Sequence, residues 1–225
     1  MSENQNNTKK AKAPWPTKDA MEQIYEMNLW GGENADFYSG AGSHHPEILD
    51  PYIEVVISFL ESFEDPLVVC DLGCGDFNVG KELLAHSQKY IAVDIVEKLI
   101  ERNKKKFKNV KLEFLCLDIA KDDLPSGDCA ILRQVLQHIS NAEVQQILNK
   151  LTGFKYVILT EHLPEEDFTP NIDIISGQGI RLKKHSGLDL SAAPFDLKAK
   201  EEKMLLSVPA KDSVGIIVTK LYTMF

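Results

Sequence analysis

The sequence predicts an α/β fold built on a mostly parallel seven-stranded sheet that ends in an antiparallel hairpin. Short apolar runs alternate with amphipathic helical patterns from residue 67 to residue 160, as they do where crossover helices join parallel strands. Each of the first three runs is followed by an aspartate, at Asp71, Asp94 and Asp118. The last two runs, 204–208 and 214–221, are joined by a connection too short for a crossover helix, so this pair must be antiparallel.

The N-terminal part is predicted to be a tail followed by a helical extension. Residues 1–14 are polar and cannot bury a core, so we expect a disordered tail there, and residues 15–63 to extend a domain at 64–225. A helix begins near Thr17, and a Gly/Ser-rich loop follows. Asp50-Pro51 is typical of a helix start, with an N-cap before a proline, and it opens a second helix with an apolar stripe.

The first apolar run and the turn after it organise the rest of the chain. Residues 67–70 predict a buried parallel strand, and a Gly-Cys-Gly turn at 73–75 separates it from a helical pattern that starts near Val79. Glycine lacks a Cβ, so the backbone of such a turn can pass close to a ligand, and the helix N-terminus offers unpaired N–H groups. This strand–turn–helix is the first unit of a nucleotide- or nucleoside-binding α/β fold. The third glycine of a dinucleotide fingerprint would fall at Asn78, which disfavours an NAD-dependent oxidoreductase.

The later elements complete the α/β pattern. Residues 161–200 are rich in Asp, Gly and Pro and lack periodicity, so we expect an irregular segment there. The strands are predicted at 90–94, 110–117, 128–132 and 156–160, and the helices over 96–107 and 140–153.

Composition argues against several classes of function. The formal net charge of −9 over 225 residues disfavours a general nucleic-acid or anionic-membrane surface. The N-terminus has no apolar h-region and no long apolar span follows, so we expect a soluble, cytoplasmic protein without a membrane partner. The four cysteines lack paired zinc spacing, which indicates buried free thiols and no metal site.

The turn Asp-Leu-Gly-Cys-Gly at 71–75, placed after an apolar strand, resembles motif I of the class I S-adenosylmethionine-dependent methyltransferases. Phe77 stands where that family usually has a third glycine. The resemblance implies a Rossmann-like class I methyltransferase fold, with S-adenosyl-L-methionine as cofactor and S-adenosyl-L-homocysteine as product.

A closer resemblance, from about residue 25 to about residue 195, is to a bacterial group of these enzymes whose members tend to accompany glycan and surface-polysaccharide biosynthesis. The sequence departs from the group at Gln134, where an acid is expected, and over 178–181. The resemblance implies O-methylation of a sugar, a glycan precursor or another small metabolite, with nitrogen and carboxylate acceptors left open. It rests on Tyr-x-x-Asn-x-Trp-Gly at 25–31, Ser-Gly-x-Gly-Ser at 39–43, Cys-Gly-Asp-Phe-Asn at 74–78 and Arg-Gln-x-Leu-x-His at 133–138.

The resemblance also implies where the cofactor binds. Asp94 would hold the ribose, Asp118 would meet the adenine amino group, and Asp71 would lie near the methionine half. Strand-end carboxylates on consecutive strands independently favour a ligand site, because ligands of open α/β sheets bind beyond the carboxyl ends of the strands. The remaining expected cofactor-binding residues are Trp30, Ser39, Gly40, Gly73, Cys74, Gly75, Asn78, Ile95, Ile119, Arg133 and Gln134.

Transfer to a hydroxyl needs a general base, and histidine has the unperturbed pKa that suits this role near neutrality. His138, in a family position near the methyl group, and His162, after the fifth strand, are the candidate catalytic residues, with His44 and His45 as further options. His138 is equally well explained as a structural residue before the 140–153 helix. Segment 161–200 is the expected acceptor wall.

Arg133 and Trp30 each have two interpretations. Arg133 would pair with the cofactor carboxylate or an anionic acceptor, or form a structural ion pair with Asp118. Trp30 would close over the cofactor or pack on the first helix.

Two other functions stay open at this point. One is a cofactor-binding protein without transferase activity, and the other, disfavoured, is the NAD-dependent oxidoreductase. The expected partner is a small-molecule or saccharide acceptor rather than nucleic acid, and the oligomeric state is left open, a homodimer included.

Overall fold

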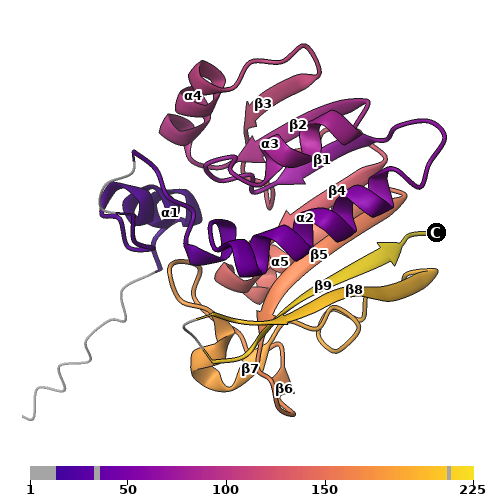
Figure 1. Ribbon diagram of the computed structural model, residues 1–225. Coiled ribbons are helices and arrows are strands. Elements are labelled where there is room, and N and C mark those ends of the chain that lie inside the picture. Colours follow the sequence, from indigo (N-terminus) through magenta and orange to yellow (C-terminus); the bar gives the residue numbers. More distant parts are fainter. Residues whose placement is uncertain (1–13, 33–35, 212–213) are drawn as a thin grey trace, which may run out of the picture.

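The computed structural model describes residues 14–32, 36–211 and 214–225. Its centre is a seven-stranded sheet in the order β3-β2-β1-β4-β5-β9-β8, with helices on both faces (Figure 1). The strand order reverses between β1 and β4, and in open α/β sheets this switch point is where ligands bind. The expected disordered tail lies outside the described residues apart from Pro14.

The parallel and antiparallel parts of the sheet follow the prediction. β9 (Ile216–Thr223) lies antiparallel both to β5 and to the edge strand β8 (Glu201–Pro209), which confirms the terminal hairpin. β5 continues to Leu163, beyond its predicted end at residue 160, because its last residues also pair with β9. The five parallel strands are β1 (Val68–Leu72), β2 (Lys89–Asp94), β3 (Leu112–Cys116), β4 (Cys129–Arg133) and β5 (Tyr156–Leu163).

The N-terminal helices are α1 (Thr17–Glu26) and α2 (Pro46–Leu60), with a 3₁₀ turn, η1 (Ala41–Ser43), between them. The predicted start of α2 at Asp50-Pro51 is wrong. Pro46 takes the first-turn position that suits proline, and the buried stripe starts at Ile48, before the predicted helix start. Pro51 therefore lies inside the helix.

The helix after the glycine turn is short. α3 (Gly80–Leu83) has four residues and passes into the 3₁₀ turn η2 (Leu84–His86). A helix of four residues has only a weak N-terminal dipole to offer a ligand. The remaining elements are α4 (Glu97–Lys106), η3 (Leu136–His138), α5 (Asn141–Leu151), β6 (Thr169–Pro170), η4 (Arg181–Lys184) and β7 (Ser186–Gly187).

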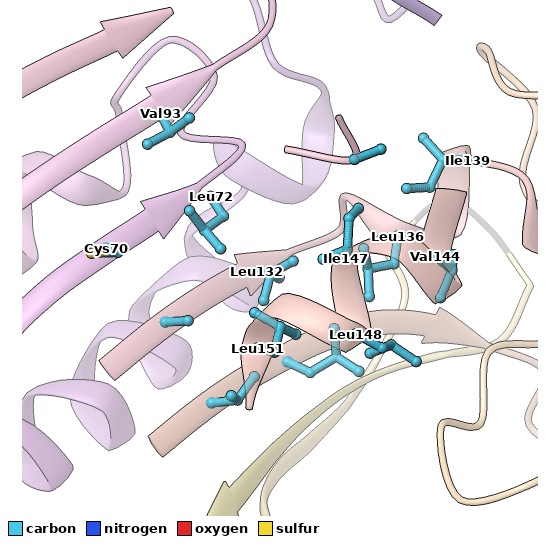
Figure 2. Packing of buried hydrophobic residues seen from close by; sticks show 14 of the residues in the cluster. Cys70, Leu72, Val93, Leu132, Leu136, Ile139, Val144, Ile147, Leu148 and Leu151 are labelled. Atoms are coloured by element: carbon cyan, nitrogen blue, oxygen red, sulfur yellow. The ribbon is translucent and has the colours of Figure 1, made fainter. Parts of the chain in front are cut away.

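Each face of the sheet buries its own apolar cluster. α5 packs on one face, where Figure 2 shows Ile147, Leu148 and Leu151 beside Leu132 of β4. α2 contributes Tyr52, Val56 and Leu60 to the cluster on the other face. Burial of such side chains stabilises the fold by about 1.5–3 kcal/mol each, so the two layers hold the strand ends that carry the candidate site.

Candidate active site

A cavity of about 230 Å³ opens at the carboxyl ends of β1, β2 and β4. It brings together residues from α1, from the described parts of the connection between α1 and α2, from the glycine turn and from the ends of the strands. His138 and every cofactor-binding residue expected from the sequence line it, apart from Asn78. His162 does not line it.

The glycine turn is tightly bonded within the protein. Gly73 and Gly75 have φ of 99° and 54°, and a Cβ on either would lie 2.3 Å from a side-chain atom of Val135 or Ser39. Both positions therefore favour glycine. The N–H groups of Gly73 and Cys74 donate to the Val93 carbonyl at 2.8 Å each. The turn thus contributes a close backbone surface to the cavity, while these two N–H groups are already used.

Asp94 at the end of β2 braces this turn and also faces the cavity. Its Oδ2 accepts from Gly75 N–H at 3.0 Å, and its Oδ1 accepts from Val96 N–H at 3.0 Å. Burial raises the pKa of this carboxyl, which the two N–H donors counteract. A carboxylate has about four acceptor positions, so Asp94 keeps capacity to accept from a ligand.

Asp118 lies at the same edge of the cavity but is more open to solvent. Its carboxylate accepts from Ala120 N–H at 3.0 Å and pairs with Lys121 at 2.7 Å. The alternative of a structural ion pair between Asp118 and Arg133 is not what the structure shows, because Arg133 bonds to other groups.

The inner end of the cavity has a buried polar floor. Tyr90 Oη donates to Asp71 Oδ2 at 3.0 Å, and burial raises the pKa of Asp71 to about 7. The guanidinium of Arg133 lies over the ring of Tyr52, 4.7 Å from its centroid. The floor of the cavity thus combines one cation, one carboxyl group and two phenols, all buried from solvent: Arg133, Asp71, Tyr52 and Tyr90.

Arg133 is held by neutral groups. Its Nη2 donates to the Gly42 carbonyl at 2.6 Å and its Nη1 to Ser43 Oγ at 3.2 Å. Its Nε and the Tyr52 hydroxyl are buried without a hydrogen-bond partner among the described residues. No salt bridge to Arg133 occurs in the described parts of the chain. A buried cation with an unused donor indicates a place for an anion.

The strap (residues 36–45) covers the glycine turn. Ser39 N–H donates to Asp76 Oδ2 at 3.0 Å, and Asp76 N–H donates to Ser39 Oγ at 2.8 Å. His44 Nε2 also contacts Asp76 Oδ2 at 2.6 Å. Asn78 donates to the Ser43 carbonyl at 2.8 Å, so this predicted cofactor ligand instead fastens the strap.

Phe77, which stands where the resemblance implied a glycine, has φ of 63° and is fully buried. Its ring lies 5.0–5.7 Å from those of Tyr90, Phe107 and Phe114. A Cβ on Gly80 would lie 2.4 Å from this ring, so Gly80 leaves the space that Phe77 fills. Phe77 therefore keeps the left-handed backbone conformation of a glycine while its side chain packs in the core.

His138 and Trp30 form one wall of the cavity, with ring centroids 5.0 Å apart. Burial lowers the pKa of His138 to about 4, so its imidazole is neutral at pH 7. Gln137 Oε1 accepts from His162 N–H at 2.8 Å, which leaves Gln137 Nε2 to donate to His138 Nε2 at 3.2 Å. This arrangement assigns the imidazole proton to Nδ1, a buried atom without a partner among the described residues.

His162 and segment 161–200 lie elsewhere. His162 Nε2 donates to the Val214 carbonyl at 2.9 Å, near the β9 end of the sheet. The structure describes all of segment 161–200, and none of its residues lines the cavity. The expected acceptor wall is instead bonded to the β4–α5 connection.

Several site residues were not predicted. Asn103 is fully buried on α4 and donates to the Gly75 carbonyl at 2.8 Å, and Arg102 donates to the Asp76 carbonyl at 3.0 Å. Asn103 at a core position of a helix was the available signal, because a buried amide needs a partner. Tyr52 gave no signal, since an aromatic residue on an apolar helix face is usually core.

The described residues contain no group of three His, Cys, Asp or Glu side chains that could hold a metal ion. Cys70, Cys74 and Cys129 are buried free thiols, whereas Cys116 is exposed, contrary to expectation. No helix in the described parts of the chain is long and apolar enough to cross a membrane.

Comparison with known proteins finds a family match and a shared fold. Residues 69–154 match the sequence model described as "Methyltransferase domain". No curated protein matches the chain.

Solved structures resemble the chain at low identity. The N-methyltransferase NodS from Bradyrhizobium japonicum WM9, in complex with S-adenosylhomocysteine, has a TM-score of 0.63 and 11% identity over 91% of this chain and 99% of its own. An S-adenosylmethionine-dependent methyltransferase from Leishmania major has a TM-score of 0.61 and 15% identity, and the match covers 92% of this chain and 86% of its own. Magnesium protoporphyrin IX methyltransferase from Synechocystis PCC 6803, with bound S-adenosylmethionine, has a TM-score of 0.57 and 16% identity, and the match covers 95% of this chain and 100% of its own. These likenesses show the fold, with the parallel core and antiparallel end described above.

Proposed function

We propose that this chain, which matches a methyltransferase domain over residues 69–154, is a class I S-adenosylmethionine-dependent enzyme that transfers the methyl group to an oxygen of a small polar metabolite. A sugar or glycan precursor is the expected class of acceptor. The observation that carries the proposal is the cavity at the switch point of the sheet. It combines a glycine turn, two strand-end carboxylates and a buried cation.

The residues of the cavity suit the cofactor. Asp94 and Asp118 offer acceptors for hydroxyl and amino groups, and the apolar side chains of Ile95 and Ile119 lie beside them in the cavity wall. Arg133 offers a charged donor suited to a carboxylate. When bound, S-adenosylmethionine supplies an activated methyl group on a sulfonium. The protein's own task is then to orient the acceptor and exclude water.

His138 is the better of the two proposed bases, because it lines the cavity and His162 does not. A neutral imidazole is the form that accepts a proton, and the pKa of about 4 keeps His138 neutral at pH 7. The proton of an acceptor hydroxyl would arrive at Nε2, the nitrogen that Gln137 now contacts. The low pKa makes His138 a weak base, which suits proton removal late in the transfer.

The acceptor class is supported by charge and by size. A net charge of −9 disfavours a polyanionic acceptor such as nucleic acid. The strap lines the cavity that would hold the cofactor, which leaves a folded macromolecule less access to the methyl group than a small molecule. The cytoplasmic location and the homodimer stay predictions.

The test is transfer of labelled methyl from S-adenosylmethionine to a panel of monosaccharides, nucleotide sugars and carboxylic acids. We expect label in a sugar hydroxyl, and His138→Ala to lower the rate at least tenfold, while His86→Ala, a change outside the cavity, leaves the rate unchanged. Label only in carboxylates, unaffected by His138→Ala, would contradict both the oxygen-on-sugar assignment and the base, because an ionised carboxylate needs no base.

The anion site at Arg133 is tested by binding. 5′-Methylthioadenosine lacks the amino-acid end of S-adenosylhomocysteine, so it has no carboxylate to bind. If Arg133 binds the cofactor carboxylate, Arg133→Met should weaken S-adenosylhomocysteine roughly 10- to 100-fold and leave 5′-methylthioadenosine unchanged. Equal effects on the two ligands would contradict this role and indicate that Arg133 only stabilises the floor.

A further inference from the structure

Arg181 is a long charged side chain that is 2% exposed and lies outside the cavity. It begins η4 in the segment that was expected to form the acceptor wall. A buried guanidinium is costly unless its donors are used, so its contacts should explain its position.

The contacts of Arg181 converge on the turn that carries His138. Its Nη1 donates to the Leu136 carbonyl at 3.1 Å, and its Nη2 donates to the Ile139 carbonyl at 3.0 Å and to Asn141 Oδ1 at 2.6 Å. A longer contact of 3.5 Å joins Nη1 to the carbonyl of Gln137. A planar guanidinium can reach several acceptors at once, which a lysine ammonium at one point cannot.

The neighbours of Arg181 complete this contact. Gly177 N–H donates to the His138 carbonyl at 2.9 Å, and Ser176 Oγ accepts from Ser140 N–H at 2.9 Å. The clasp (residues 176–181) therefore binds four consecutive carbonyls, those of residues 136–139. The side chains of Leu136 and Ile139 are anchored in the core beside α5 (Figure 2). The turn is held from both sides, and little freedom remains for the imidazole of His138.

The clasp also reaches the other half of the aromatic wall. Gln178 Nε2 donates to the carbonyl of Leu29 at 2.7 Å, directly before Trp30. One short segment thus bonds to the backbone beside Trp30 and to the backbone of His138, whose rings lie 5.0 Å apart in the cavity wall.

We infer that Arg181 and Gln178 are positioning residues, which hold Trp30 and His138 together as a wall of the cavity without touching a ligand themselves. The inference rests on the proposed function in one respect, namely that this wall faces the cofactor or the acceptor. Its structural part, the distance between the two rings, stands without any ligand.

The experiment uses the full chain with Trp15→Phe, which leaves Trp30 as its single tryptophan. Arg181→Lys keeps the positive charge but loses the planar guanidinium that reaches several carbonyls at once. Gln178→Ala removes one exposed hydrogen bond. Lys183→Ala is the control, because Lys183 is an exposed cation of the same η4 turn. Circular dichroism and thermal unfolding establish that each variant is folded at the working temperature. The measurements are Trp30 emission with iodide quenching, the pH midpoint of His138 by NMR, and the affinity for S-adenosylhomocysteine.

In folded Arg181→Lys we expect Trp30 to become at least twice as accessible to iodide and the affinity for S-adenosylhomocysteine to fall about tenfold. The His138 midpoint should move upward from about 4 toward the ordinary value of 6.5, because a released imidazole becomes hydrated. Gln178→Ala should show the Trp30 change with a smaller His138 change, and Lys183→Ala neither. If Arg181→Lys does not fold, iodide quenching of Gln178→Ala alone tests whether the clasp positions Trp30.

A lowered unfolding temperature with unchanged Trp30 quenching, His138 midpoint and affinity in both variants would overturn the inference, since the clasp would then only stabilise. If the parent protein binds no S-adenosylhomocysteine but the Trp30 and His138 signals move as expected, the positioning role stands and the proposed function fails.

Discussion

Phe77 shows how one residue reconciles a backbone requirement with a packing requirement. Its φ of 63° is the conformation that glycine adopts freely, yet its ring fills a fully buried aromatic cluster. Truncating a buried phenylalanine costs about 3–5 kcal/mol, whereas relief of a left-handed backbone returns about 1 kcal/mol. Burial therefore outweighs the backbone strain at this position.

Phe77→Gly should accordingly lower the free energy of unfolding by about 2–4 kcal/mol, even though glycine is the usual residue of the family here. Phe77→Ala, which keeps the strain and loses the ring, should be at least as harmful. Urea denaturation of the three proteins measures this order. A glycine variant as stable as the parent would show that the aromatic cluster contributes little.

Glu161 gives the clearest dependence of stability on pH. Both of its carboxylate oxygens are buried without a hydrogen-bond partner among the described residues, and burial raises its pKa to about 8. Arg181 is the nearby cation that opposes this shift. The folded state thus holds a proton that the unfolded state releases near pH 4.5, so Glu161 favours folding fully below pH 4.5 and progressively less as pH rises to 8.

Glu161→Gln should therefore match the parent in free energy of unfolding near pH 5. It should exceed the parent increasingly up to pH 8, by up to about 1.4 kcal/mol per pH unit, as measured by urea denaturation across this pH range. Glutamine cannot ionise, and it resembles the protonated acid in shape. Exposed Glu166→Gln is the control and should show no such trend. A difference that does not grow with pH would mean that Glu161 is ionised and compensated by Arg181.

At the scale of elements, the strap and the glycine turn are joined through Asp76. Its carboxylate accepts from Ser39 N–H and contacts His44 Nε2, and it is 5% exposed. Farther out, the ion pair of Asp36 with Arg102 fastens the same strap, but Asp36 is 62% exposed. Buried hydrogen bonds to a charged group contribute about 1.5–3 kcal/mol, and exposed ion pairs less than about 1 kcal/mol.

Asp76→Asn should for this reason speed the dissociation of S-adenosylhomocysteine about 10- to 100-fold in stopped-flow fluorescence, since the strap covers the cavity. Asp36→Asn, the matched change at the exposed fastening, should alter the rate less than fivefold. Similar rates for both variants would show that Asp76 does not control release from the cavity.

The elements that the sequence predicted well are those whose signal is local. The β1 strand, the glycine turn and the terminal hairpin follow from apolar runs, from glycine at positive φ and from a connection too short to cross over. The start of α2 was wrong because two prolines, Pro46 and Pro51, both satisfy the local rule, and only packing of Ile48 decides between them.

The sequence could not show, for a related reason, that segment 161–200 lies away from the cavity. Segment 161–200 has no periodicity, and its place depends on long-range bonds such as that of Arg181 to the η3 carbonyls. Asp94 and Arg133 line the cavity, as the sequence predicted, because strand ends converge at one edge of a parallel sheet. Asp76 and Asn103 were missed because their partners are backbone groups far along the chain, which no spacing encodes.

For the whole molecule, the cavity is the place where separate parts of the chain meet. Residues of α1, the strap, the strand ends of both halves of the sheet and α5 all line it. A ligand that fills it contacts only the folded arrangement, so it must stabilise the protein by mass action.

S-Adenosylhomocysteine at 100 times its Kd should therefore add about 2.7 kcal/mol to the free energy of unfolding and raise Tm by about 5–10 °C for a chain of this length. Asp94→Asn should lose most of this increase, because Asp94 both braces the glycine turn and faces the cavity, whereas exposed Asp123→Asn should keep it. Differential scanning calorimetry with S-adenosylhomocysteine and with NAD measures the two shifts in parallel. A comparable increase with NAD, and none with S-adenosylhomocysteine, would reverse the assignment of the cavity to a sulfur nucleoside and restore the dinucleotide alternative.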